Sequence, residues 1–490
     1  MQSIAKKILS LQLFVFLILG AILGLAVTNV TTMPSRLMAI MLMALAFPFV
    51  AFIVGDVRRF LLALIVFSIP LIIDVNFKHI NENQAGSATL GIALRDVFVI
   101  MLLLWWIIEL ATSEEPPFRF FARLTVPAII YVEVCLLTFL WAPRLDLATL
   151  EIVQMVKVVV LFFVVANQIR DRTDLRLVIW VLCATVAFES IISIIQMVTG
   201  KSLALGFLGE MQIRNRDMNK LMRAGGTLGH PNRLAMFLEF LLPLVFGTFL
   251  LEKKFRNRMI ALVIFGLGMA SMIITGSRGG WGAMLVSLIL FFFLLIRNQH
   301  ISVRKLLGPV LITLVLGSLM YAVFYNTIQR RLFGEDYGSA ISRIPMFQIA
   351  AALIEKHPVG GVGINNYAVV MREYNNTILG RRFGTIPRPV HNIYLLITGE
   401  TGVIGLFAFL LLIVSIVRSL LKTIKSPDIE LSIVAISLLS GFAAFLIHGL
   451  VDKHPPGGNP LFYFLMAMVA AISVMASHSS GNQSENSPAL

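Results

Sequence analysis

Long apolar runs follow one another along almost the whole chain, and shorter polar segments separate them. A helix needs roughly 20 apolar residues to cross a membrane. The pattern therefore predicts an all-α polytopic membrane protein with about 14 transmembrane helices, or 12 if the two shortest runs do not cross. The runs are 8–27, 37–54, 59–73, 92–111, 124–141, 149–167, 177–199, 232–250, 258–275, 281–296, 306–325, 392–418, 430–450 and 460–477.

The polar segments differ in length and divide the chain into five parts. Residues 1–199 hold the N-terminal membrane helices, and residues 200–325 hold core helices after a first long loop at 200–233. Residues 326–391 form the largest loop, and residues 392–477 hold the C-terminal membrane helices. The polar tail, 478–490, is expected to be disordered.

The largest loop has a pattern of its own. Residues 343–356 carry apolar side chains at helical spacing, which predicts an amphipathic helix on the membrane surface or on the bundle. The stripe that sets this spacing is Ile344, Phe347, Ala351 and Ile354, with Ile349, Ala350 and Leu353 alongside. His357-Pro358 ends the helix, three glycines at 360, 361 and 363 predict a turn, and residues 365–375 predict a second short helix.

Composition supports the membrane assignment. The chain is 58% hydrophobic and only 13% charged, whereas soluble proteins carry about 25% charged residues. The net charge of +14 is spread over many loops, which argues against nucleic acid as a partner. The two cysteines, Cys135 and Cys183, lie in apolar runs, so neither a disulfide framework nor a metal site is expected.

The distribution of Lys and Arg predicts the orientation. With the N-terminus in the cytoplasm, every inner segment carries at least two basic residues, as inner loops normally do. Both termini are then cytoplasmic, and loops 200–233 and 326–391 face the outer side. These two outer loops are nevertheless basic, and the longer one has eight basic against four acidic residues. They form either a solvated or headgroup-facing surface, or a site for an anionic substrate.

One turn between two predicted spans, Thr275-Gly-Ser-Arg-Gly-Gly280, combines several anion-binding features. The helix after it begins at the outer side, so its free N–H groups and positive dipole end point outward. Arg278 adds a fork of donors, and the glycines allow a backbone nest for a phosphate or diphosphate. The alternative is a tight turn whose arginine reaches lipid headgroups.

Two further helix starts lie on the same side. Arg223-Ala-Gly-Gly-Thr-Leu-Gly-His-Pro-Asn-Arg233 precedes span 232–250, where His230, Asn232 and Arg233 can serve as capping residues. His391-Asn392 opens span 392–418, and on an ideal helix His391, Leu395, Thr398 and Gly402 share a face. His391 is then either an interfacial hydrogen-bonding group or a general base.

Several charged residues fall inside predicted spans, where charges are expensive. Among them are Glu133, Glu151, Lys157, Glu189 and Glu239. Glu151 and Lys157 are six residues apart and point away from each other on one helix, so we expect ion pairs between helices.

Four motifs in one order resemble the superfamily of bacterial O-antigen ligases and polymerases, over about residues 220–415. His391-Asn392, nine residues and then Gly402-Val-Ile-Gly405 match its most characteristic motif. Ser277-Arg278-Gly279 is similar to its Ser-Arg-Gly turn. Gly226-Thr-Leu-Gly-His-Pro-Asn232 resembles its glycine-rich stretch, and Arg343 with His357-Pro-Val-Gly-Gly-Val-Gly363 resembles the start of its large periplasmic loop.

The resemblance implies a GT-C-like fold in the bacterial inner (cytoplasmic) membrane, with the active site on the periplasmic side. It implies a metal-independent glycosyltransferase without a cofactor, whose donor is a glycan on undecaprenyl diphosphate. The acceptor is another glycan in a polymerase, lipid A core in a ligase, or a protein in an oligosaccharyltransferase. A count of 14 spans is nearer the polymerases, because the ligases have about 12. A chain-length regulator is a further possible partner.

Carried onto this chain, the resemblance assigns roles to individual residues. Arg278 and Arg343 bind the diphosphate with Arg223 in support, His391 activates the acceptor hydroxyl and Asn392 orients it. Ser277, Gly279 and Arg233 support the site. Two other classes stay open: a transporter of lipid-linked oligosaccharides, whose polar groups would lie at mid-membrane, and an assembly protein without catalytic activity.

Overall fold

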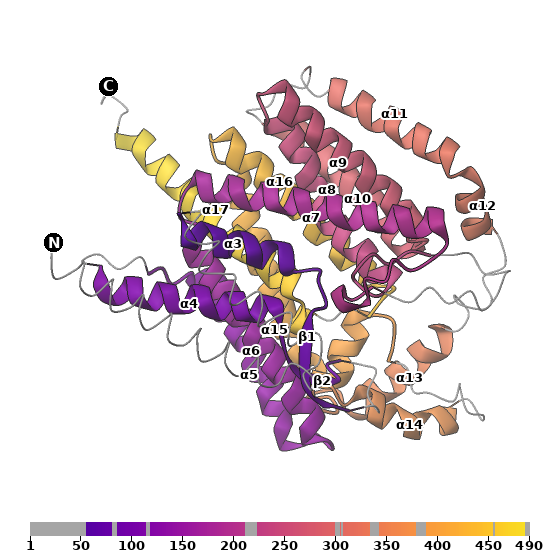
Figure 1. Cartoon of the computed structure of the whole chain (residues 1–490). Coiled ribbons are helices and arrows are strands. Elements are labelled where there is room, and N and C mark those ends of the chain that lie inside the picture. The colour runs from indigo at the N-terminus through magenta and orange to yellow at the C-terminus, as the bar shows by residue number, and fades with distance from the viewer. Residues whose placement is uncertain are drawn as a thin grey trace, which may run out of the picture.

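The computed structural model describes residues 55–80, 86–113, 118–210, 223–298, 304, 307–333, 343–378, 389–453 and 456–485. The predicted spans 8–27 and 37–54 lie outside these residues. The fold is almost entirely helical, with one antiparallel pair of strands (Figure 1).

The elements follow the chain in a simple order. The strands are β1 (Asp74–His79) and β2 (Thr89–Ala93). The helices are α3 (Val57–Ser68), α4 (Leu94–Thr112), α5 (Ala122–Leu137), α6 (Leu145–Gln168), α7 (Arg172–Thr199), α8 (Pro231–Leu251), α9 (Phe255–Ile274), α10 (Arg278–Arg297), α11 (Leu307–Val323), α12 (Tyr325–Phe333), α13 (Arg343–Lys356), α14 (Tyr367–Ile378), α15 (Ile393–Ile424), α16 (Ile429–His448) and α17 (Pro460–Glu485).

Within the described residues, nine helices are long and apolar enough to cross a membrane: α5 to α10 and α15 to α17. The bent pair of α11 and α12 adds a tenth if it counts as one span. The prediction that runs 59–73 and 92–111 cross the membrane is wrong. Helix α3 has only 12 residues, and α4 carries Arg95, Asp96 and Glu109 within its 19 residues. The multi-pass membrane fold is confirmed, with fewer spans in this region than the apolar runs predict.

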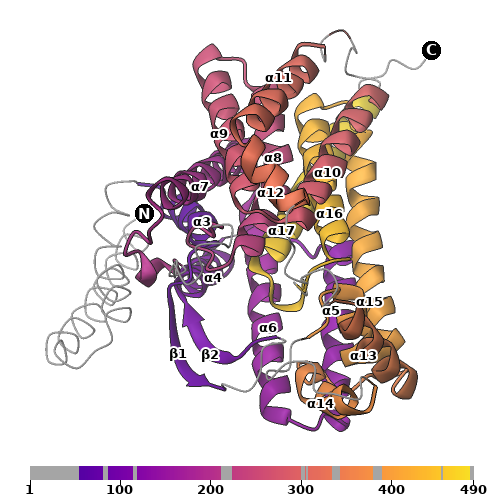
Figure 2. The same cartoon turned by 90° about the vertical axis from the view of Figure 1, so that its right-hand side faces the viewer.

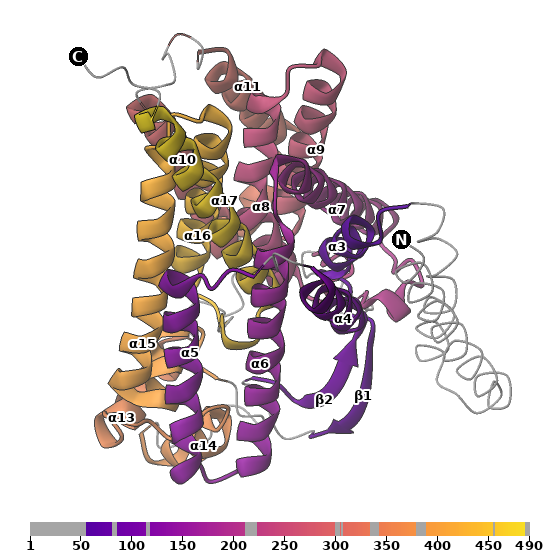
Figure 3. The same cartoon turned by 90° about the vertical axis from the view of Figure 1, so that its left-hand side faces the viewer.

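The centre of the bundle is built by α8, α16 and α17. In the most apolar window of each, 89%, 83% and 72% of the residues are buried inside the protein, against 33% for α10. Phe240 of α8 packs against Phe442 and Phe445 of α16. Helices α5, α6 and α15 stand side by side at one flank (Figure 3). Cys135 and Cys183 are buried and free, as expected.

Several basic residues that are predicted to face the cytoplasm form ion pairs with acidic residues of other helices. Asp174 accepts hydrogen bonds from Arg58 and Arg59 at 2.7–2.9 Å. At the start of α16, Glu430 accepts from Arg176. These contacts join the beginnings of α3, α7 and α16, so the charged ends of these helices gather in one place.

Several charges inside the membrane helices have partners. Lys157 of α6 forms an ion pair with Asp96 of α4, which confirms the expected pairing between helices. Glu151 instead accepts a hydrogen bond from the backbone N–H of Ser87 at 2.8 Å. Glu189 of α7 accepts hydrogen bonds from Thr227 in the glycine-rich stretch.

The largest loop contains the two predicted helices, α13 and α14, and a further one, α12. Figure 2 shows α13 and α14 together beside α15. Two residues of the predicted apolar stripe of α13, Ile344 and Ala351, are exposed. The face that packs on α14 and α15 is made by Met346 and by the three residues expected beside the stripe, Ile349, Ala350 and Leu353.

Helix α15 is broken near its start. Gly402 has φ +67° and ψ −171°, which interrupts the helical backbone after only nine residues. The turn after α13 packs against this break. Val403 N–H donates to Pro358 O at 2.9 Å, and Val362 N–H donates to Gly399 O at 2.9 Å. The long part of the helix therefore begins after Gly402, and His391 precedes a short, separate segment. At the other terminus, α17 continues to Glu485, into the tail that the sequence predicts to be disordered.

Candidate active site where α8, α10, α15 and α16 meet

The turn between α9 and α10 has the geometry of a helix start with an arginine at its first position. Gly276 has φ +58°, a left-handed conformation that glycine adopts without strain. Ser277 is the N-cap, and its hydroxyl accepts a hydrogen bond from Gly280 N–H at 3.3 Å. Arg278 is the first residue of α10. The motif Ser277-Arg278-Gly279 therefore consists of the N-cap and the first two residues of α10.

Arg223 lies against this turn. Its Nε donates to Thr275 O at 2.7 Å, and its Nη2 donates to Asn232 Oδ1 at 2.6 Å. Burial, followed by the positive charge of Arg331 and the smaller effect of Arg278, lowers the pKa of Arg223 to about 10. The group is still protonated at neutral pH. Three arginines therefore lie within electrostatic range of one another.

The largest loop brings two arginines, Arg331 and Arg343, toward this turn. Arg331 of α12 donates through Nε to Gly276 O at 2.7 Å, which brings α12 to the same turn. Arg343, the first residue of α13, is close enough for its charge to act on His448 at the end of α16. The structure thus gathers Arg223, Arg278 and Arg331 at the turn and brings Arg343 within range of its neighbours.

His391 precedes the N-cap of α15 and faces a carboxylate. Its Nδ1 lies 3.2 Å from Asp452 Oδ1, and 27% of its side chain is exposed. Because a nitrogen that faces a carboxylate carries the proton, the neutral ring has its lone pair on Nε2. A base whose second nitrogen is held by a carboxylate is the arrangement that acyl-transfer enzymes use to activate a hydroxyl.

Asp452 connects the histidine to the arginines. Its Oδ2 accepts from Asn232 Nδ2 at 2.6 Å, and its Oδ1 accepts from Lys453 N–H at 2.7 Å. Asn232 in turn accepts from Arg223. A continuous series of hydrogen bonds therefore runs from His391 through Asp452 and Asn232 to Arg223.

A second histidine lies behind this network. His448 Nδ1 faces Glu239 Oε2 at 2.9 Å, and both side chains are buried. Its Nε2 lies 3.5 Å from Ser277 Oγ and 3.8 Å from Asp452 Oδ2. A Cβ on Gly279 would come within 2.9 Å of this ring, so a glycine is needed where α10 crosses α16. The pair anchors α8 to α16 directly beneath the turn.

The remaining predicted residues have structural contacts. Asn392 is the N-cap of α15: its side-chain Oδ1 accepts from Leu395 N–H at 2.9 Å, and its Nδ2 donates to Leu450 O at 3.1 Å. His230 is the N-cap of α8 and accepts from Asn232 N–H at 3.1 Å. Arg233 is exposed on the first turn of α8, with its charge in range of Asp452.

Sequence reasoning missed Asp452, His448 and Arg331 as site residues and treated Glu239 only as a buried charge. Asp452 and His448 are four residues apart at the end of α16, a spacing that places both on one side of a helix end. Their partners lie more than 60 positions away in the chain, so only the fold brings Asp452 to His391 and His448 to Glu239.

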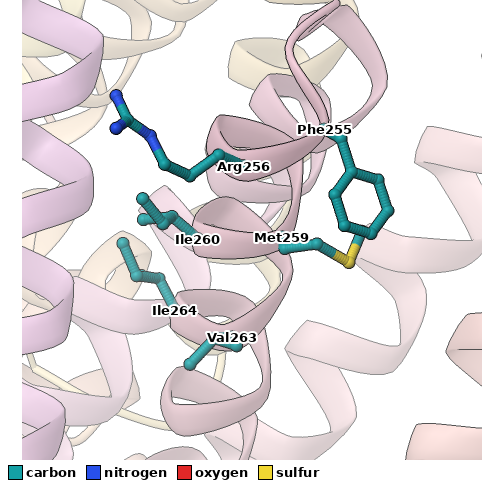
Figure 4. A pocket seen from close by; sticks show the side chains of 6 residues that line it. All are labelled: Phe255, Arg256, Met259, Ile260, Val263 and Ile264. Carbon is teal, nitrogen blue, oxygen red and sulfur yellow. The ribbon is translucent and has the colours of Figure 1, made fainter.

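A shallow apolar hollow elsewhere on the surface is a different kind of feature. Its lining residues all come from the first half of α9: Phe255, Arg256, Met259, Ile260, Val263 and Ile264 (Figure 4). The turn at Thr275 lies beyond the other end of the same helix. In a membrane this face borders lipid, and the hollow is unrelated to the histidine and arginine cluster.

Comparison with known families places this geometry in context. Residues 260–410 match the family model described as O-antigen ligase, and this range contains Arg278, Arg331, Arg343 and His391. No curated protein matches the chain. The family domain supports a role in glycan transfer during the assembly of surface polysaccharides. The match supports the resemblance of this part of the chain to the superfamily of O-antigen ligases and polymerases.

Proposed function

We propose that the protein transfers a glycan from undecaprenyl diphosphate to an acceptor hydroxyl at the periplasmic face of the bacterial inner membrane. The observation that carries this proposal is the hydrogen-bonded connection from His391 through Asp452 and Asn232 to Arg223. It unites a candidate base and a candidate anion site in one structure.

The reaction needs two kinds of group. The acceptor oxygen attacks the anomeric carbon, the bond from that carbon to the diphosphate oxygen breaks, and the hydroxyl proton passes to His391 Nε2. Asp452 stabilises the imidazolium that forms, since the carboxylate lies 3.2 Å from Nδ1.

The arginines serve the leaving group. A diphosphate leaves as an anion, so it needs positive charge more than it needs a proton. Guanidinium groups suit this task because they stay charged and donate two hydrogen bonds in a fixed plane. In this proposal Arg223, Arg278 and Arg343 bind the diphosphate, while Ser277 and Gly279 hold the turn. Asn392 positions the helix that follows His391.

The acceptor is a separate matter. The expectation of a polymerase rested on 14 predicted spans, and α3 and α4 do not reach spanning length and composition. The proposal therefore covers transfer to a hydroxyl and leaves the acceptor to a direct assay.

The experiment uses purified full-length protein in nanodiscs and lipid-linked glycan extracted from cells that lack the protein. Longer chains on the lipid carrier identify a polymerase, and transfer only after addition of lipid A core identifies a ligase. A wild-type protein that moves the intact lipid-linked glycan across vesicles, without forming a new glycosidic bond, contradicts the proposal and favours a transporter.

A further inference from the structure

Helices α11 and α12 form a bent arm at the edge of the bundle (Figures 1 and 2). Their axes differ by 78° at a short break. Pro309 is the only buried residue of α11, and α12 has none. Ile312 and Leu316 of α11 pack against the bundle, but most of its apolar side chains are exposed and face lipid, and α12 turns from the lipid toward the α9–α10 turn.

The inner end of the arm is held at the candidate anion site. Arg331 Nε donates to Gly276 O at 2.7 Å, and Arg223 Nε donates to the preceding carbonyl, Thr275 O, also at 2.7 Å. Two consecutive carbonyl groups of one turn therefore fix the planes of two guanidinium groups. A fixed plane matters because it determines where the other donors of the fork point.

The charge of Arg331 also acts on Arg223. Among neighbouring charges, Arg331 has the largest effect on the pKa of Arg223, ahead of both Asp452 and Arg278. Both hydrogen-bond partners that the structure gives Arg223 are uncharged. Gathering like charges in a partly buried place is unfavourable, and an anion with several charged oxygens relieves it.

We propose that Arg331 is an additional donor-binding residue, which α12 brings to the diphosphate from the side of the surrounding lipid. The inference rests on the proposed function and deepens it. A donor with a polyprenyl tail arrives within the lipid, so a cationic group at the end of a lipid-facing arm is the first part of the site that the diphosphate meets. Arg331 then contributes mainly to donor affinity, and His391 to the chemical step.

Arg330 provides a matched control. It is the neighbouring residue on α12 and carries the same charge, but it is exposed whereas Arg331 is half-buried. Arg331→Gln and Arg330→Gln therefore change the net charge of the same helix equally. Arg331→Lys keeps the charge and loses the Nε–H that bonds Gly276.

The probe is undecaprenyl diphosphate, titrated against full-length protein in nanodiscs of neutral phosphatidylcholine. We expect Arg331→Gln to weaken binding by about ten-fold or more, since charge-assisted hydrogen bonds to phosphate are among the stronger ones. Arg331→Lys is intermediate, and Arg330→Gln changes binding by less than about two-fold. In the transfer assay, Arg331→Gln raises the KM for the donor with a smaller effect on kcat.

Several results overturn the inference. If Arg330→Gln and Arg331→Gln weaken binding equally, Arg331 acts only through the general surface charge of α12. An effect that occurs only in anionic phosphatidylglycerol nanodiscs assigns Arg331 to phospholipid headgroups instead. Arg331→Lys with a wild-type melting temperature and wild-type affinity shows that the fork is not used. A wild-type protein that neither binds the probe nor transfers glycan refutes the proposed function itself, before Arg331 is tested.

Discussion

Asp452 is the residue on which the connection between the base and the arginines depends. It lies within hydrogen-bond distance of His391, Asn232 and the backbone N–H of Lys453. Asp452→Asn keeps the size of the side chain but presents a neutral amide to the imidazole. We expect kcat to fall by about 10²–10⁴-fold, because the imidazolium loses its counter-charge and the ring can adopt the wrong tautomer.

The readout for Asp452→Asn is the transfer rate at saturating donor, with donor binding measured in parallel. Donor affinity should change little, because the arginines remain. A variant with nearly wild-type kcat would show that His391 works without the carboxylate. Loss of donor binding alone would place Asp452 with the anion site.

The sequence predicted some of these residues for identifiable reasons. Arg278 and His391 stand at helix starts within recognisable motifs, so the chain itself marks them. Asp452 stands in a short turn without such a signal, and its partner His391 is 61 residues away. Arg331 was counted only as one of eight basic residues in its loop, because nothing in the local pattern indicates that its Nε reaches Gly276.

At the scale of elements, the break in α15 explains the glycine at position 402 of the family motif. A Cβ there would lie 1.9 Å from Val359 O, and φ is +67°. The sequence analysis placed this glycine on one face with His391 within a single long span. The structure shows close approach to a loop instead, and the backbone conformation of Gly402 ends the short segment after His391.

We expect Gly402→Ala to destabilise the protein by about 2 kcal/mol or more, because strain and a backbone clash act together. The measurement is the thermal unfolding midpoint in detergent. Gly266→Ala is the control: it lies in α9, where an added Cβ meets nothing within 4 Å, and alanine favours a helix. If both variants melted at the wild-type temperature, the break would be adaptable rather than required.

Element boundaries were predicted well where apolar periodicity is strong, as in α13, which spans Arg343–Lys356 as expected. The assignment of membrane spans failed where charges are satisfied by distant partners. The run at 92–111 looks long enough to cross, but Asp96 pairs with Lys157 of α6, and β2 precedes the helix. Periodicity gave only part of the buried face of α13: Ile349, Ala350 and Leu353 pack inward as expected, whereas Ile344 and Ala351 are exposed, because the neighbouring helices determine which side packs.

At the scale of the whole molecule, the orientation in the membrane is still a prediction from the Lys and Arg distribution. It places residue 201 outside and residue 253 inside, and both side chains are exposed. We expect Lys201→Cys to react with an impermeant maleimide in spheroplasts, and Lys253→Cys to react only after permeabilisation. The native cysteines are buried and do not interfere. The reverse labelling pattern would invert the topology and move the candidate site to the cytoplasmic side.

The division of labour between His391 and the arginines is tested most directly by His391→Gln. Glutamine keeps a hydrogen-bonding side chain but cannot accept the proton of the acceptor hydroxyl. Measured on purified protein in nanodiscs, undecaprenyl diphosphate binding should be unchanged while kcat for glycan transfer falls by about 10²–10⁴-fold. A His391→Gln protein that retains a large share of wild-type kcat, or one that no longer binds undecaprenyl diphosphate, would contradict the assignment of His391 as the base.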